Sequence, residues 1–226
     1  MSHEIFTAET FVSQIASNDS SSLLRIYSIS TGAPFTSQSS AEFSHHSQFV
    51  YASDFQKRHK AQYSKFPTLS EIAVQVNSIN AKFDVAFVDP WHEIEDSFQI
   101  IEIAIEQLHS GATLIMHDCH PRNPDLRAVS APEVFPYAWC GSTWTAWSLL
   151  TMSLSPEFSW ITIDADFGLG VLKVPNSKSQ RRRLLRLVRS LSKQWSSGDL
   201  RRPEWSADAE HLHLVAPEDP RVATWT

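Results

Sequence analysis

The sequence has few cysteines, no long apolar run and no excess of basic residues, and each of these absences excludes a class of protein. The two cysteines among 226 residues are too few for a disulfide framework and are typical of a reduced compartment. No apolar run approaches the roughly 20 residues that a membrane span requires. The formal net charge of −6 does not provide the basic footprint that nucleic-acid binding needs.

The remaining composition is that of an ordinary globular protein. Hydrophobic residues make up 42% of the chain, which is long enough for one α/β domain with a full core. The first residues carry an early acid, Glu4, and no apolar segment, so we expect no signal peptide. These features predict a cytoplasmic protein with no nucleic-acid partner and no membrane span. Whether it forms a homo-oligomer stays open.

Strand and helix patterns alternate along the chain, which predicts a layered α/β fold with a mostly parallel sheet. The expected strands cover residues 23–29, 48–52, 83–89, 112–117, 160–164 and 170–174. The expected helices cover residues 68–81, 92–109 and 142–152, where apolar residues recur at helical spacing. Gly111 is expected to end the second helix, and Gly168 to supply the tight turn of a terminal hairpin.

The last 50 residues differ in character from the rest. Residues 1–176 are expected to form the α/β domain, and residues 177–226 a basic helix and tail packed on it. Arginines and a lysine between Arg181 and Lys193 surround a stripe of leucines. Such a helix can lie on an anionic membrane or bind an acidic partner. We favour the simpler interpretation, in which the leucines pack on the body and the charges face water.

Two acids and two histidines stand where two expected strands end. Asp89 and His92 follow one strand, and His117 and Asp118 follow the next. Parallel strands direct their carboxyl ends into a shared crevice, where α/β proteins bind ligands. Asp89 is therefore a candidate general base, and Asp89 and Asp118 together are candidate ligands of a hard divalent cation such as Mg²⁺.

Simpler roles compete for the same residues. Asp89 has the residue type preferred as the N-cap of the following helix. His117 could be a buried imidazole bonded to a neighbouring loop, and His92 a surface residue of a first helical turn. Cys119 lies between these groups in sequence, but adjacency alone establishes no nucleophile, and we interpret it as inert. Trp144 and Trp147 are expected in the core, whereas Trp91 is expected to be exposed beside Asp89.

Four motifs occur in a fixed order: residues 83–92 (FDVAFVDPWH), 117–121 (HDCHP), 141–144 (GSTW) and 164–171 (DADFGLGV). Together they resemble the C-terminal two-thirds of class I S-adenosylmethionine-dependent methyltransferases. The nearest subgroup is the small-molecule and sugar O-methyltransferases, with Asp-x-x-His after strand four and His-Asp after strand five. The resemblance implies a Rossmann-like, mostly parallel seven-stranded sheet with a reversed last strand. It also implies O-methylation of a sugar or small-molecule hydroxyl with S-adenosylmethionine (SAM) as cofactor.

The resemblance also implies site residues. The catalytic candidates are Asp89, His92 and His117, and the metal ligands are Asp89 and Asp118. Cofactor-binding candidates are Gly32, Asp54, Asp89 and Trp91; Asp54 stands where a ribose-binding acid would be, and the Trp91 ring could lie beside a sulfonium.

The chain departs from the family pattern after the first strand, because residues 27–35 (YSISTGAPF) contain one glycine, Gly32, and no acid precedes it. Two other functions therefore stay open. One is a binding or scaffold protein whose degenerate glycine motif reflects lost catalysis. The other is a metal-dependent hydrolase that uses Asp89, His92, His117 and Asp118.

Overall fold

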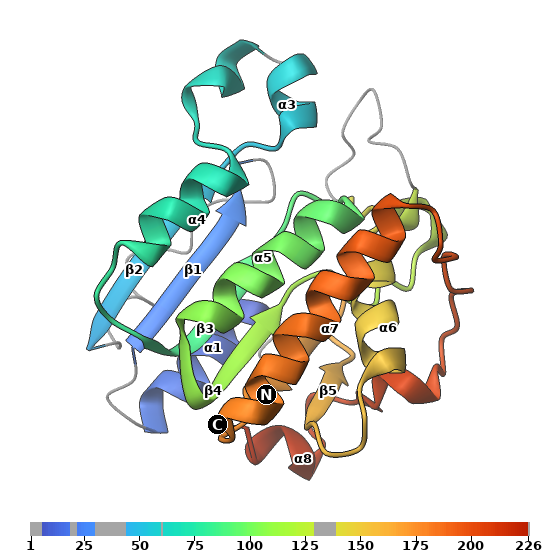
Figure 1. Cartoon of the computed structure of the whole chain (residues 1–226). Coiled ribbons are helices and arrows are strands. Elements are labelled where there is room, and N and C mark those ends of the chain that lie inside the picture. Colours follow the sequence, from blue (N-terminus) through green and yellow to red (C-terminus); the bar gives the residue numbers. More distant parts are fainter. Residues whose placement is uncertain (1–5, 19–21, 30–43, 60, 129–138, 226) are drawn as a thin grey trace.

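The computed structural model describes residues 6–18, 22–29, 44–59, 61–128 and 139–225. Its centre is a seven-stranded sheet in the order β2-β1-β3-β4-β6-β5-β7 (Figure 1). The strands are β1 (Ser22–Ser28), β2 (His45–Tyr51), β3 (Phe83–Asp89), β4 (Leu108–Met116), β5 (Trp160–Ile163), β6 (Leu169–Lys173) and β7 (Leu214–Val215). The helices are α1 (Ala8–Asn18), α3 (Asp54–His59), α4 (Leu69–Asn77), α5 (Ile94–Gln107), α6 (Thr143–Ser153), α7 (Lys178–Ser196) and α8 (Pro220–Ala223), with short 3-10 turns η1 (Ala61–Lys65), η2 (Pro124–Arg127) and η3 (Glu210–Leu212).

The sheet is mostly parallel with one reversed strand, as the sequence predicted. Strands β2, β1, β3 and β4 run parallel to one another, and β6 is antiparallel to both of its neighbours, β4 and β5. Strand β6 is the last strand of residues 1–176. The tail adds β7, which pairs parallel with β5 and had no counterpart among the expected strands. The fold is Rossmann-like, and the strand order changes direction between β1 and β3.

Two apolar layers cover the sheet, because successive side chains of each strand point to opposite faces. Helices α4, α5, α6 and α7 cover one face and bury residues such as Leu24, Ala86 and Leu114 (Figure 1). Helices α1 and α8 cover the other face, where Leu23 and Val85 lie. Strand β3, apolar from Val85 to Val88, is therefore buried from both sides, as expected for a central strand.

Several element boundaries differ from the sequence prediction, and three of the differences have a clear local cause or consequence. Helix α5 ends at Gln107 and the chain enters β4 directly at Leu108, so Gly111 lies inside a strand and does not end the helix. Strand β2 begins at His45 rather than at residue 48. Helix α4 ends at Asn77, although the apolar spacing continues to Ile79, because the Ser78 side chain bonds the Gln75 carbonyl and closes the last turn.

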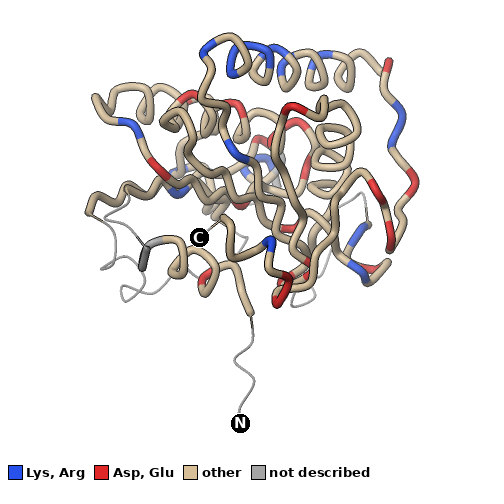
Figure 2. The backbone as a smooth tube through the Cα atoms, turned by 90° about the horizontal axis from the view of Figure 1, so that it is seen from below, with Lys and Arg blue, Asp and Glu red and all other residues tan. Residues whose placement is uncertain are grey.

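Helix α7 confirms the simpler interpretation of the basic segment. Its buried residues are Leu184, Val188 and Leu191, and it lies against α5. Arg189 bridges Glu102 and Glu106 of α5 at 2.6 and 2.7 Å. Figure 2 shows the other basic residues of this helix along the outer surface of the molecule. Across the described ranges, no helix has both the length and the apolar character that crossing a bilayer requires.

Candidate functional site

The carboxyl ends of β3 and β4 bring together the two acids and two histidines that the sequence singled out. Asp89 is the last residue of β3, and Val88 pairs with Met116 of β4. The His117 N–H donates to the Val88 carbonyl at 3.0 Å, which extends this pairing by one residue. Asp118 then adopts a left-handed conformation with φ of 60°. The chain thus turns out of the sheet directly beside Asp89.

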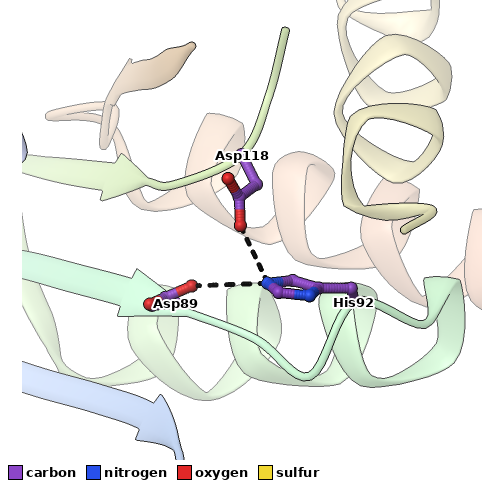
Figure 3. A group of neighbouring side chains, drawn as sticks. All are labelled: Asp89, His92 and Asp118. Carbon is purple, nitrogen blue, oxygen red and sulfur yellow. Dashed lines mark ion pairs between the residues drawn. The ribbon is translucent and has the colours of Figure 1, made fainter. Parts of the chain in front are cut away.

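Each side chain of this acid–imidazole cluster (Asp89, His92, His117, Asp118 and Asp166) lies within ion-pair distance of at least one other. The His92 Nε2 atom lies 2.8 Å from Asp118 Oδ2 and 3.9 Å from Asp89 Oδ1 (Figure 3). The His117 Nδ1 atom lies 3.6 Å from both Asp89 Oδ1 and Asp118 Oδ2. Asp89, His92 and Asp118 are all more than nine-tenths buried.

These contacts lack the alignment of hydrogen bonds. Among the described residues, both ring nitrogens of His92 and of His117 and the Oδ1 atom of Asp89 are buried without a hydrogen-bond partner. Buried polar atoms are normally paired, since an unpaired one loses its hydration without compensation. Here several unpaired polar atoms converge on one point. A bound cation or a reacting group would supply the partner that these atoms lack.

Three of these side chains have the spacing of a metal site. Asp89, His92 and Asp118 each offer a ligand atom, and the three atoms lie within 4.8 Å of one another. Two carboxylate oxygens suit Mg²⁺ or Mn²⁺, and the imidazole nitrogen shifts the preference toward a transition metal. The sequence predicted Asp89 and Asp118 as metal ligands, with His92 and His117 as possible nitrogen ligands, and the spacing fits for Asp89, His92 and Asp118.

The cluster fixes the charge state of His117. Burial opposes the charged imidazole, but the carboxylates of Asp118, Asp166 and Asp89 outweigh it, so the pKa of His117 is well above its ordinary value. Burial would likewise raise the pKa of Asp118, but the two imidazoles hold it well below the usual range. His117 is therefore an imidazolium at neutral pH, held by carboxylates on both of its ring nitrogens.

Asp166 is the member of the cluster that the sequence did not single out. It lies in the turn between β5 and β6, and its Oδ2 atom is 3.4 Å from His117 Nε2. The same oxygen accepts a hydrogen bond from the Ala8 N–H at 2.7 Å. Its neighbourhood in sequence, DADFG, has the composition of an ordinary turn. The local sequence therefore does not distinguish an aspartate that contacts His117 from an ordinary turn residue.

The simpler roles considered for Asp89 and His92 do not apply. Helix α5 begins at Ile94, and its N-cap position is Glu93, so Asp89 does not cap it. His92 is only 6% exposed and is not a surface residue. His117 does contact a neighbouring turn, through Asp166. Cys119 is completely buried, and burial raises the pKa of its thiol well above the usual value, consistent with an inert cysteine.

Trp91 is not exposed, contrary to expectation. Only 2% of its surface is accessible, and its ring stacks on His92 with centroids 6.1 Å apart. The Trp91 N–H donates to the Tyr51 hydroxyl at 2.7 Å, which ties the turn after β3 to the end of β2. Trp139 meets His92 edge-on at 5.1 Å. Two indoles thus fix the His92 ring, while Trp144 and Trp147 are buried as predicted.

Of the expected cofactor residues, Asp89 and Trp91 lie in or against the acid–imidazole cluster, and Asp54 follows β2, two strands away in the sheet. Gly32 falls outside the described residues. Asp54 is exposed and is the first residue of α3, directly after β2. The hydroxyl of Ser53, not the Asp54 carboxylate, accepts the Gln56 N–H at 3.1 Å, so Asp54 is not needed as the cap. A cleft of about 600 Å³ between α3, η1 and α4 is lined by Lys57, Phe66 and Glu71 but by none of the predicted site residues.

Comparison with known proteins gives structural neighbours only. No family model matches the sequence, and no curated protein matches it. The methyltransferase PaMTH1 of Podospora anserina, bound to S-adenosylhomocysteine (SAH), is 11% identical over 73% of this chain and 76% of its own, with a TM-score of 0.43. The O-methyltransferase TomG of Streptomyces achromogenes, in complex with SAM, is 13% identical over 74% and 79%, with a TM-score of 0.44.

An O-methyltransferase from Bacillus cereus in complex with SAH is 13% identical, covers 76% of this chain and 82% of its own, and has a TM-score of 0.42. These structures are methyltransferases, the class that the sequence motifs resemble. Identities and TM-scores this low carry no residue role over to this chain. The function therefore has to be argued from its own side chains.

Proposed function

We propose that this protein is a SAM-dependent methyltransferase that transfers the methyl group to a hydroxyl of a sugar or other small molecule. The observation that carries the proposal is the convergence of Asp89, His92 and Asp118 at the carboxyl edge of a Rossmann-like sheet. Ligands of such sheets bind at this edge, next to the point where the strand order changes direction. Here that point is the junction of β1 and β3, and Asp89 ends β3.

The cofactor would lie over the ends of β1 and β2. Gly32 follows β1 and would allow close approach of the cofactor's amino-acid end. Asp54 follows β2, and its exposed carboxylate could accept hydrogen bonds from both ribose hydroxyls. Trp91 would act indirectly, because its buried ring positions His92.

The acid–imidazole cluster would prepare the acceptor. In the transfer, the acceptor oxygen forms a bond to the methyl carbon, the carbon–sulfur bond breaks, and the hydroxyl proton must leave. A divalent cation, when bound, would lower the pKa of that hydroxyl. Asp89, His92 and Asp118 would hold the cation, and Asp89 or His92 could instead take the proton directly. We assign His117 an orienting role, because its raised pKa leaves no free lone pair at neutral pH.

Calorimetric titration with SAM tests the cofactor half of the proposal. The wild-type protein should bind SAM, and Asp54→Asn should weaken binding about tenfold because charge-assisted hydrogen bonds to the ribose are lost. Asp208→Asn is the matched control, since Asp208 is an exposed acid far along the tail. A wild-type protein that does not bind SAM at all would remove the methyltransferase assignment.

Thermal unfolding with added Mg²⁺, Mn²⁺ or Zn²⁺ tests the metal half. A cation that binds only the folded state should raise the melting temperature of the wild type. Asp89→Ala should abolish that rise and, once an acceptor is in hand, abolish turnover, while Asp208→Asn should change neither. An unchanged cation response in Asp89→Ala would remove Asp89 from the metal site, and retained turnover would remove it from the mechanism.

A metal-dependent hydrolase is the second candidate. It is favoured by one observation, the His92 imidazole beside two carboxylates, since a nitrogen ligand suits Zn²⁺ and a bound Zn²⁺ can activate water. Binding of Zn²⁺ without any binding of SAM would support it. Binding of neither would instead support a protein that keeps the fold as a binding or scaffold module.

A further inference from the structure

A second group of side chains, joined to the loop after β4 by the stacking of Trp205 on His120, carries positive charge without an ion pair to any described acid. This guanidinium–indole cluster consists of Arg127, Trp144, Arg202 and Trp205. The Arg127 guanidinium carbon lies 3.8 Å from the centroid of the Trp205 ring, and that of Arg202 lies 4.9 Å from the Trp144 ring. The Arg202 Nη2 atom donates to the Arg127 carbonyl at 3.1 Å. Two segments separated by 75 residues thus hold their arginines side by side.

Neither arginine has a counter-charge within the described part of the chain. Both are partly buried, yet no ion pair involves either of them, and the Arg127 Nη1 atom is buried without a hydrogen-bond partner. Burial lowers the pKa of both guanidiniums, and the charge of Arg127 lowers that of Arg202 further. Two like charges that are partly desolvated and unpaired raise the free energy of the folded protein.

Other arginines of this protein are paired. Arg122 bonds Asp164 with two nitrogens, and Arg189 bonds Glu102 and Glu106. Arg221 bonds Asp219. Among the described residues, acids therefore pair with several surface arginines, but no ion pair reaches the two arginines that stack on indoles. When an indole packs against the face of a guanidinium, it does not cover the N–H groups along the edge of the guanidinium. These N–H groups are the part of the arginine side chain that binds oxyanions.

Short links join the guanidinium–indole cluster to His92. Leu126, the residue before Arg127, accepts hydrogen bonds from the N–H groups of Cys140 and Gly141 at 2.9 Å each. The next residue, Ser142, donates its N–H to the His92 carbonyl at 2.7 Å. Trp144 follows two residues later in the first turn of α6. Toward the N-terminus, residues 119–126 connect Arg127 directly to Asp118.

We propose that Arg127 and Arg202 form a binding site for an oxyanion, a carboxylate or a phosphate, carried by the acceptor substrate. This inference rests on the proposed function and narrows it to anionic acceptors. The anionic group would pair with the two guanidiniums, and the hydroxyl to be methylated would lie toward Asp89, His92 and Asp118. Arg127 and Arg202 would then determine specificity without taking part in the chemistry.

The test uses the full-length protein, without SAM or metal, and two probe anions, inorganic phosphate and acetate. Calorimetry should show saturable binding of at least one of them to the wild type, and the tighter probe identifies the class of oxyanion. Arg127→Gln and Arg202→Gln should each weaken that binding about tenfold or more, because a charge-assisted contact is lost. Arg186→Gln is the matched control, an exposed cation of α7 that should leave binding unchanged.

Thermal unfolding separates a binding role from a purely structural one. Without anion, Arg202→Gln should leave the melting temperature unchanged or raise it, because repulsion from Arg127 is relieved. Added anion should raise the melting temperature of the wild type but not of the variant. A structural role for Arg202 predicts the reverse: a lower melting temperature in the variant and no response to anion in either protein.

Two results would overturn the inference. One is a wild-type protein that binds neither phosphate nor acetate, and the other is equal binding by the wild type and both glutamine variants. Binding of SAM together with either result overturns the anion site alone and leaves the proposed function. Binding of anion without binding of SAM keeps the two arginines as an oxyanion site but overturns its assignment to a methyl acceptor.

Discussion

The two clusters at the carboxyl edge of the sheet are built on opposite electrostatic principles. In the acid–imidazole cluster, groups of opposite charge alternate, so each buried charge has a partner within 4 Å. In the guanidinium–indole cluster, two like charges stand together and aromatic faces replace acids. Charges of the first cluster are largely compensated within the cluster, whereas those of the second have no ion-pair partner among the described residues.

The backbone that holds each cluster also differs. Asp89 ends β3 and His117 follows β4, so the central strands fix their positions. Arg127 lies in a short 3-10 turn and Arg202 in the tail after α7. The acid–imidazole cluster should therefore be rigid, and substitutions in it should lower the stability of the fold. Substitutions in the guanidinium–indole cluster should be tolerated by the fold and should change ligand binding.

The largest expected effect comes from Asp118→Asn. This change keeps the shape of the side chain but removes the carboxylate between His92 and His117, which lie 2.8 and 3.6 Å from its Oδ2 atom. We expect the free energy of unfolding to fall by about 3 kcal/mol, as when one partner of a buried pair is removed. Urea unfolding at pH 6 with a chelator present measures it.

The same variant should change how stability depends on pH. The pKa of His117 is raised in the folded protein, so its stabilisation is fully present below the unfolded value of about 6.5 and is lost as pH rises through the folded value. The wild type should therefore lose stability as pH rises from the unfolded pKa toward the folded pKa. Because Asp118 is the chief carboxylate raising this pKa, the loss in Asp118→Asn should be smaller and complete at lower pH. Identical pH profiles for the two proteins would mean that the charges of the cluster are not coupled.

The turn between β5 and β6 serves both clusters, and Gly168→Ala should disturb both. Gly168 has φ of 90°, and a Cβ atom there would lie 2.2 Å from the backbone nitrogen of His120. We expect a loss of about 3 kcal/mol, since backbone strain and a clash with rigid backbone add. Gly198→Ala is the control, because φ is 78° but nothing lies within 4 Å, so only the strain of about 1 kcal/mol should appear. Equal losses in the two variants would mean that the contact with His120 relaxes freely.

The two clusters also differ in how far the sequence predicts them. An apolar run from Val85 to Val88 and another that ends before His117 predict two central strands. Parallel strands end at one edge, so the meeting of Asp89 with Asp118 follows from local pattern. Arg127 and Arg202 lie in segments without periodicity, and their meeting depends on the path of the tail. Trp91 was misjudged for a related reason. The turn after β3 suggests exposure, but the hydroxyl of Tyr51 from a distant strand holds this residue inside.

The smallest effect is expected for Trp205→Leu, which sharpens the comparison. The Trp205 ring stacks with His120 at 5.3 Å and lies under Arg127, so it joins the tail to the loop after β4. Leucine keeps part of the apolar contact and removes the attraction for the guanidinium, at a cost of about 1 kcal/mol. Trp225→Leu is the control, because Trp225 packs on the opposite face of the sheet. Trp205→Leu should weaken anion binding and leave the cation response of Asp89, His92 and Asp118 intact. A Trp205→Leu variant that loses both anion binding and the cation response would show that the two clusters depend on each other. A residue of the tail would then be needed to hold Asp89, His92 and Asp118 in place.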